Sequence, residues 1–119
     1  MALGDFRKVL PKADEIRITV VGRSSGRKVT LPVWFAHDDR ALYLLPVRGS
    51  DSPWYLNLVK NRRIALAARG STWRARKVTL IRSRARVHRI ADMFREKYGA
   101  SDVKKYYSKF DVAVGLPLG

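Results

Sequence analysis

The first half of the chain alternates apolar and polar positions in short runs, as strands with one buried face do. Residues 15–22 alternate β-branched apolar residues with mostly polar ones, which predicts a strand. Residues 29–36 resume as a second strand after a turn rich in glycine and serine, and residues 41–47 form an apolar run typical of a buried strand. Together these segments predict a three-stranded meander.

The spacing of the apolar residues changes from that of a strand to that of a helix at Pro53. Asp51 or Ser52 can cap this helix, which is about two turns long. Residues 64–68 form an apolar run that predicts another strand. In the segment 72–87 that follows, the arginines stand at even-numbered positions and most apolar residues at odd-numbered ones, which in a strand puts them on opposite faces. This alternation predicts one long strand with a solvent face and a core face.

Two apolar residues interrupt the arginine face of this long strand, because Val78 and Leu80 stand at even-numbered positions, as the arginines do. Either a bulge turns both residues inward, or something covers the middle of the outer face. The next helix follows too directly to fold back over that face, so a second subunit is the simpler cover. The pattern therefore predicts a homodimer, with the bulge as the alternative.

The last third of the chain changes to helical spacing. Apolar residues recur at that spacing over 87–98, Gly99 ends this helix, and Ser101 can cap another short one. Residues 111–118 have the pattern of a last strand, broken by a glycine and a proline. Five or six short strands, with one helix between strands and two near the C-terminus, predict a single α+β domain over 1–119. It is mainly β and folds as a closed or partly closed barrel, and an alternating βαβ fold is excluded.

Composition narrows the chemistry that this domain can carry. The 119 residues contain no cysteine, which excludes disulfides, thiolate catalysis and cysteine-ligated metals. With 25 lysines and arginines against 10 acidic residues, the net charge is +15, and such a charge attracts polyanions or phosphorylated small molecules. The sequence has no apolar run of the length of a signal peptide or a membrane span, so we expect a cytoplasmic protein.

Two basic loops are candidates for binding a phosphate. In the turn 22–28, glycines free backbone N–H groups and the serines and cations add donors, although an ordinary hairpin has the same composition. The loop 48–53 leads into a helix N-terminus, where an anion or a simple cap fits equally well. Beside it, Trp54 offers a planar ring or a core side chain.

The remaining candidates are weaker. His37 and His88 lack the spacing of metal ligands, and we predict no metal site. Tyr106 and Tyr107 are candidate proton donors, although tyrosines near a helix end also serve in packing. A row of arginines at 82, 84 and 86 is compatible with a nucleic-acid backbone or with a solvated strand face.

In their order and spacing, these segments resemble the deazaflavin (coenzyme F-420)-dependent nitroreductase family, which is related to the split-barrel FMN-binding proteins. The resemblance is carried by the turn 22–26, Pro32, the pair 48–49 and the helix start Trp54-Tyr55-Leu56-Asn57-Leu58. It implies a split β-barrel of the FMN-binding kind. By match to the family's motifs, the residues implied to bind the coenzyme are Arg23, Ser24, Ser25, Gly26, Pro32, Arg48, Gly49, Ser50, Trp54, Tyr55 and Asn57.

The resemblance also implies an oxidoreductase. The reduced deazaflavin coenzyme passes hydride to a quinone, a nitroaromatic or an activated alkene, and Tyr106 and Tyr107 are the candidate catalytic residues. FMN as the cofactor is the first alternative. A cofactor-free, basic, nucleic-acid-binding barrel is the second, because of the positive charge.

Overall fold

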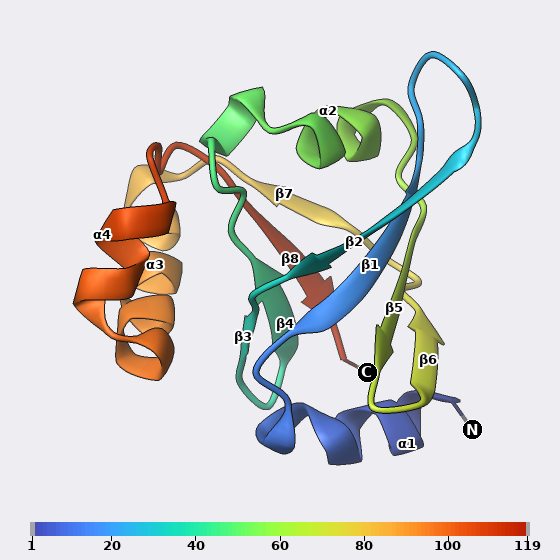
Figure 1. The fold of residues 1–119 in the computed structure, drawn as a ribbon, viewed down its shortest axis with the longest axis horizontal. Coiled ribbons are helices and arrows are strands. Elements are labelled where there is room, and N and C mark those ends of the chain that lie inside the picture. The colour runs from blue at the N-terminus through green and yellow to red at the C-terminus, as the bar shows by residue number, and fades with distance from the viewer. Residues whose placement is uncertain (1, 119) are drawn as a thin grey trace.

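The computed structural model describes residues 2–118, which form two four-stranded antiparallel sheets with helices around them (Figure 1). We call these sheets A and B. Sheet A has the strand order β2-β1-β5-β6 and sheet B the order β3-β4-β8-β7. In chain order the elements are α1 (Ala2–Val9), η1 (Leu10–Lys12), β1 (Ile16–Val21), β2 (Lys28–Val33), β3 (Ala36–His37), β4 (Ala41–Leu44), η2 (Gly49–Asp51), α2 (Pro53–Lys60), β5 (Ile64–Ala68), β6 (Ser71–Arg74), β7 (Thr79–Ile81), α3 (Arg84–Tyr98), α4 (Ala100–Tyr106) and β8 (Ala113–Pro117).

The two sheets differ in how much of their surface is buried. β1 and β5 of sheet A alternate buried positions with exposed or half-buried ones, whereas β4 and β8 of sheet B are buried on almost every position. One core cluster lies between the sheets, and a second lies between sheet B and the helices α3 and α4. Sheet B is therefore covered on both faces, and this explains the unbroken apolar run predicted at 41–47.

The predicted three-stranded meander is wrong. The segment 29–36 is divided between the sheets: β2 pairs with β1 in sheet A, and β3 pairs with β4 in sheet B. The chain changes sheets at Trp34 and Phe35, and Phe35 and Ala36 are both buried. In a strand with one buried face, every second residue is buried, so two consecutive buried residues depart from that pattern. They occur here because the segment that crosses between the sheets has the core on both sides.

The predicted long strand over 72–87 is also wrong. β6 ends at Arg74 in sheet A, β7 begins at Thr79 in sheet B, and α3 already begins at Arg84. Ser83 caps that helix by accepting a hydrogen bond from the backbone N–H of Arg86. The arginines at 82, 84 and 86 thus do not form a strand face.

The crossing between β6 and β7 also removes the basis of the predicted homodimer. Val78 is only 9% exposed and belongs to the core between the sheets, and the half-buried Leu80 packs against the same core. The connection between the two strands resets the register, so Val78 is covered and Leu80 is partly covered within one chain.

The helices between and after the strands agree better with the sequence. α2 begins at Pro53 and α3 ends at Gly99, whose φ of 95° lies in the left-handed region that favours glycine. α4 starts at Ala100, so Ser101 lies in its first turn and does not cap it. The last strand is confirmed, but Gly115 lies inside it, where a side chain would press on Ile81 and Tyr43.

The sequence analysis missed the first helix. α1 packs against β6, and Phe6 lies 5.5 Å from Trp73 between ring centroids. The two sheets do not close into one barrel, so the mixed α+β class is confirmed and full closure is not. Among the helices of residues 2–118, none combines the length and apolar character that crossing a bilayer requires.

Candidate functional site

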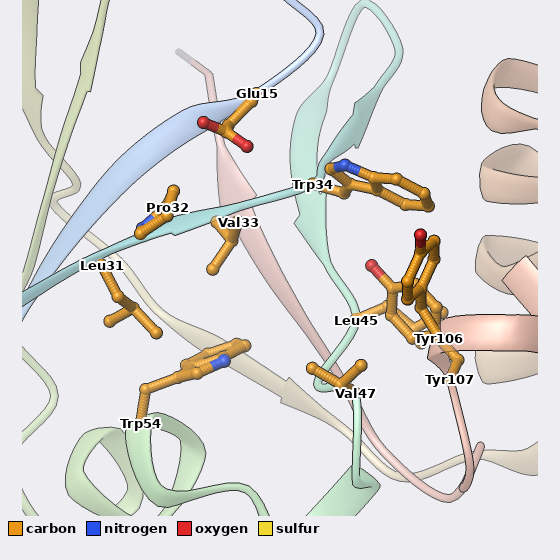
Figure 2. Close-up of a pocket in the computed structure, with 10 residues that line it drawn as sticks. All are labelled: Glu15, Leu31, Pro32, Val33, Trp34, Leu45, Val47, Trp54, Tyr106 and Tyr107. Atoms are coloured by element: carbon orange, nitrogen blue, oxygen red, sulfur yellow. The ribbon is translucent and has the colours of Figure 1, made fainter. Parts of the chain in front are cut away.

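An open cleft of about 340 Å³ lies where β2, the start of α2 and the end of α4 meet (Figure 2). We call it the aromatic cleft. Trp54 stands on one side of it and the tyrosines of α4 and its end on the other. Its walls are mainly apolar, and Glu15 is the one charged lining residue in the described chain. The lining residues are Glu15, Leu31, Pro32, Val33, Trp34, Leu45, Val47, Trp54, Tyr106 and Tyr107.

Stacked aromatic rings hold one wall of this cleft. Trp34 stacks on Tyr98, with ring centroids 4.2 Å apart and planes 8° from parallel. Trp34 also meets Tyr106 edge-to-face at 5.6 Å, and Tyr107 in a tilted arrangement at 6.1 Å. These offset and edge contacts are the arrangements that aromatic quadrupoles favour, so the wall is ordered before any ligand binds.

The Tyr98 hydroxyl anchors this wall to the strands. It accepts a hydrogen bond from the backbone N–H of Phe35 at 3.1 Å and donates to the carbonyl of Asp14 at 2.7 Å. Burial raises the pKa of Tyr98 to about 12, so this hydroxyl keeps its proton at neutral pH. The neighbouring Lys97 donates to the Phe35 carbonyl, and burial lowers the pKa of Lys97 to about 8.

The two candidate catalytic tyrosines differ in their surroundings. Tyr107 is buried and burial raises its pKa, whereas Tyr106 is 53% exposed. Both hydroxyl oxygens lie on the side of their rings toward Trp34 (Figure 2). Because Tyr107 stays protonated at neutral pH, it is suited to donate a proton and not to accept one.

The free edge of a sheet borders the cleft as well. β2 is the outermost strand of sheet A and pairs with β1 alone among the described strands. An edge strand leaves half of its backbone N–H and C=O groups unpaired. Residues 31–33 of this edge line the cleft, and Pro32 among them has no backbone N–H, so its backbone can only accept a hydrogen bond from a ligand.

The first predicted phosphate turn is tied to α2. Asn57 is buried, and its side-chain oxygen accepts hydrogen bonds from the backbone N–H of Arg23 at 3.1 Å and from the Arg23 guanidinium at 2.8 Å. The hydroxyl of Ser25 accepts from the backbone N–H of Arg27. Ser24, Ser25 and Gly26 are exposed and do not line the cleft. The turn thus lies beside the helix start, but its most ordered contacts are internal.

The second predicted phosphate loop already binds a carboxylate of its own chain. Asp111 accepts hydrogen bonds from the backbone N–H of Ser50 at 2.9 Å and from its hydroxyl at 2.5 Å. The hydrogen bonds from Ser50 and the charge of Lys109 hold the pKa of Asp111 below its usual value, against the opposing effect of burial. Gly49 has a φ of 54°, and a side chain there would collide with this carboxylate. Asp111 thus occupies two donors that the sequence analysis offered to a phosphate.

The structure gathers four of the predicted site residues at the cleft, namely Pro32, Trp54, Tyr106 and Tyr107. Arg23, Asn57 and the loop 48–50 lie around the start of α2 outside it. Tyr55 is buried in the core, and its hydroxyl has no partner within residues 2–118. Among those residues, no group of three or more histidine, aspartate or glutamate side chains is placed to hold a metal.

Sequence reasoning missed six of the ten lining residues, namely Glu15, Leu31, Val33, Trp34, Leu45 and Val47. Trp34 had one usable signal, since it follows Pro32 by two residues and therefore points to the same side of an extended chain. Glu15 and Val47 had none, because they reach the cleft only through the pairing of distant segments.

Comparison with solved structures shows the class of fold. A structure described as an F420-H2 dependent reductase (FDR-A) is 17% identical, with 87% of this chain and 93% of that chain covered and a TM-score of 0.64. A putative pyridoxamine 5'-phosphate oxidase from Listeria innocua is 14% identical, with 98% and 94% covered and a TM-score of 0.68. A third structure, described as a domain-swapped dimer, is 14% identical, with 95% and 94% covered and a TM-score of 0.67.

These likenesses establish a fold of the split-barrel kind, and at such identities they establish the fold alone. The chain itself belongs to the family described as an uncharacterized protein conserved in bacteria (DUF2255), whose model matches residues 8–113. No curated protein matches the sequence. The family shown for this chain is therefore DUF2255, and what it shares with the F420-H2 dependent reductase is the fold; membership of the nitroreductase family is not shown.

Proposed function

We propose that the aromatic cleft binds the ring system of a deazaflavin or flavin coenzyme and that the protein is an oxidoreductase. The observation that carries this proposal is the cleft itself: Trp54 and Tyr106 face each other across an apolar space at the free edge of β2. A planar, largely apolar ring with polar atoms along one edge has the chemistry that such walls and such a strand edge accept. The likeness in fold to the F420-H2 dependent reductase supports the same choice.

The residues present fit the ring better than they fit the whole coenzyme. A space of about 340 Å³ lies near the lower end for ligand sites, and no cation lines it among the described residues. A phosphate must therefore lie outside the cleft, toward the start of α2. Arg48 and Arg23 flank that helix start: the backbone N–H of Arg48 donates to Ser52, and the Arg23 side chain donates to the Pro53 carbonyl.

A reduced coenzyme bound there supplies a hydride, and the chain supplies position, exclusion of water and a proton. Trp54 and Val47 exclude water from one side of the ring site. We assign to Tyr107, which lines the cleft and whose raised pKa keeps it protonated, the donation of the proton that balances hydride transfer to a quinone, a nitroaromatic or an activated alkene. Tyr106, being more exposed, borders the side from which such an acceptor enters.

Deazaflavin is favoured over FMN because Asp111 already occupies the Ser50 donors. The loop then has less capacity to enclose the single compact phosphate of FMN. A coenzyme whose charge is spread along a longer tail depends less on that loop.

Tryptophan fluorescence tests the site. Adding the deazaflavin coenzyme should quench both Trp54 and Trp34, which line the cleft, and a Trp54→Phe variant should lose the part of the quenching that Trp54 contributes. Trp73 is the matched control, because it packs against Phe6 away from the cleft, and Trp73→Phe should keep the quenching. Equal quenching in the wild type and both variants contradicts the proposed site, and tighter binding of FMN than of deazaflavin contradicts the preference for deazaflavin.

The homodimer remains a prediction, although Val78 and Leu80 no longer argue for it. One structure of the same fold is described as a domain-swapped dimer, which shows that such folds pair. Sedimentation at micromolar concentration measures the state of this chain directly, and a monomer there contradicts the prediction.

A further inference from the structure

A second recess of the molecule has the opposite character to the aromatic cleft. It has a volume of about 400 Å³ and lies where β1, β2, β5 and the end of β6 meet. We call it the basic hollow. Its lining contains five cations and no acidic residue, and these cations are Lys28, Arg62, Arg63, Arg74 and Arg76.

The register of sheet A explains why these cations converge. Thr19 pairs with Thr30 on one side and with Ala65 on the other, and Ala65 pairs in turn with Arg74. These four residues form one row across the sheet, about 14 Å wide from three strand spacings. Residues two apart on a strand point to the same face, so Lys28 lies on the same outer face as Thr30.

The cations of this hollow have no acidic partners. The ion pairs among residues 2–118 join Arg95 to Asp92, and Lys109 to Asp51 and Asp111. None includes a cation of the basic hollow. Like charges at one end of a sheet repel one another, and a recess lined by one sign of charge concentrates the field toward solvent. Such a surface is stabilised by an anion.

The charge continues beyond this hollow. A neighbouring recess shares Arg62 and adds the cations Lys77 and Arg82. The two recesses adjoin at Arg62 and together present seven cations. A single phosphate group needs two or three such donors, so seven cations in two adjoining recesses fit a chain of phosphates.

Neither recess has an aromatic lining residue. Proteins that grip bases usually stack them on aromatic rings, whereas contacts to phosphates alone carry no sequence information. We propose that the basic hollow and its neighbour bind the phosphate backbone of a nucleic acid without sequence preference, at a site separate from the aromatic cleft.

Binding of fluorescently labelled 20-nucleotide single strands of different sequence tests this proposal. With five to seven phosphate contacts, the logarithm of the association constant should fall with the logarithm of salt with a slope of about −3.5 to −5. Oligo-dA and oligo-dT should bind alike. ATP should compete more weakly than the oligonucleotide at equal phosphate, because it reaches only some of the seven cations.

Paired variants separate this site from the general charge of the protein. Replacing Arg63 and Arg76 with alanine should flatten the salt slope by about 1.4 and weaken binding roughly 25-fold at 0.1 M salt. The matched control is Lys8→Ala with Lys104→Ala, which removes the same charge from exposed positions on α1 and α4. The control should change the slope by less than a third as much.

Three results overturn the proposal. One is an equal loss in both double variants, which makes the net charge the sole cause. Another is competition by ATP as strong as by the oligonucleotide, which makes the ligand a small phosphorylated molecule, or binding of inorganic polyphosphate that is tighter than binding of the oligonucleotide, which makes the ligand a phosphate chain of another source. The third is displacement of the oligonucleotide by the deazaflavin coenzyme, which makes the hollow part of the coenzyme site.

Discussion

The aromatic cleft and the basic hollow share a strand and nearly the same size, yet their chemistry is opposite. β2 contributes Lys28 to the hollow and Pro32 to the cleft, positions about 13 Å apart along a strand. The cleft, of about 340 Å³, has one charged lining residue, and the hollow, of about 400 Å³, has five. What a recess binds is therefore decided by the elements around it and not by its volume.

Packing explains the difference. Helices α2 and α4 stand beside the cleft and bring aromatic side chains to it. The hollow lies on the outer face of sheet A and is lined by strands and connections alone. Where helices pack, desolvation favours apolar walls; where a sheet face meets water, cations remain hydrated at little cost.

The largest expected contrast is in stability. Trp54 is 5% exposed and belongs both to the cleft wall and to the core, so Trp54→Ala should lower the free energy of unfolding by about 3–5 kcal/mol. Arg63 is exposed, so Arg63→Ala should change it by less than about 0.5 kcal/mol. Urea denaturation measures both. A loss of more than about 2 kcal/mol for Arg63→Ala would show that the hollow is structural.

The next contrast concerns the loop that Asp111 fills at the rim of the cleft. Gly49 and Gly26 both have positive φ, but only at Gly49 does a side chain meet Asp111. Gly26→Ala should cost about 1–2 kcal/mol for the left-handed backbone alone. Gly49→Ala should cost about 1.5 kcal/mol more, from lost hydrogen bonds to a carboxylate whose side chain is 38% exposed. Equal costs in thermal unfolding contradict the account of this loop.

The smallest expected effect comes from Lys97 behind the cleft wall. Burial lowers its pKa from 10.5 to about 8, so the folded chain binds fewer protons than the unfolded chain between these values. Stability should therefore rise slightly as pH increases from about 8 toward 10.5. The side chain is partly exposed, which keeps the effect small. A Lys97→Gln variant should lack this rise, and an unchanged pH profile in that variant assigns the rise to other groups.

Local pattern was enough for the elements whose neighbours are near in sequence. The strand at 15–22, the helix starting at Pro53 and the glycine that ends α3 follow from periodicity and capping. The pattern failed where the chain changes sheets, at Trp34 and between Arg74 and Thr79. When the chain passes from one sheet to the other, the set of alternate residues that faces the core changes. The local sequence pattern does not indicate where this happens.

The candidate site divides in the same way. Trp54 was a candidate from its place at a helix start, with a core side chain as the alternative, whereas Pro32 came only from the resemblance to a family motif. The engagement of Ser50 by Asp111 was not found from sequence, because 61 residues separate the partners and only the fold brings them together. The sequence does not show whether the hydrogen-bond donors of Ser50 are free for a ligand or already bound by another residue of the chain.

By itself, then, the amino-acid sequence determined the α+β class, the order of most elements and the excess of positive charge. The tertiary structure alone decided that the chain forms two sheets, that aromatic residues from α2, from α4 and from the segment after β2 share one cleft, and that cations without an ion-pair partner among residues 2–118 collect on the outer face of sheet A. The physical reason is the distance along the chain over which each effect acts. Propensity and periodicity act over one or two turns, whereas recesses form between segments that pack together only when the whole chain has folded.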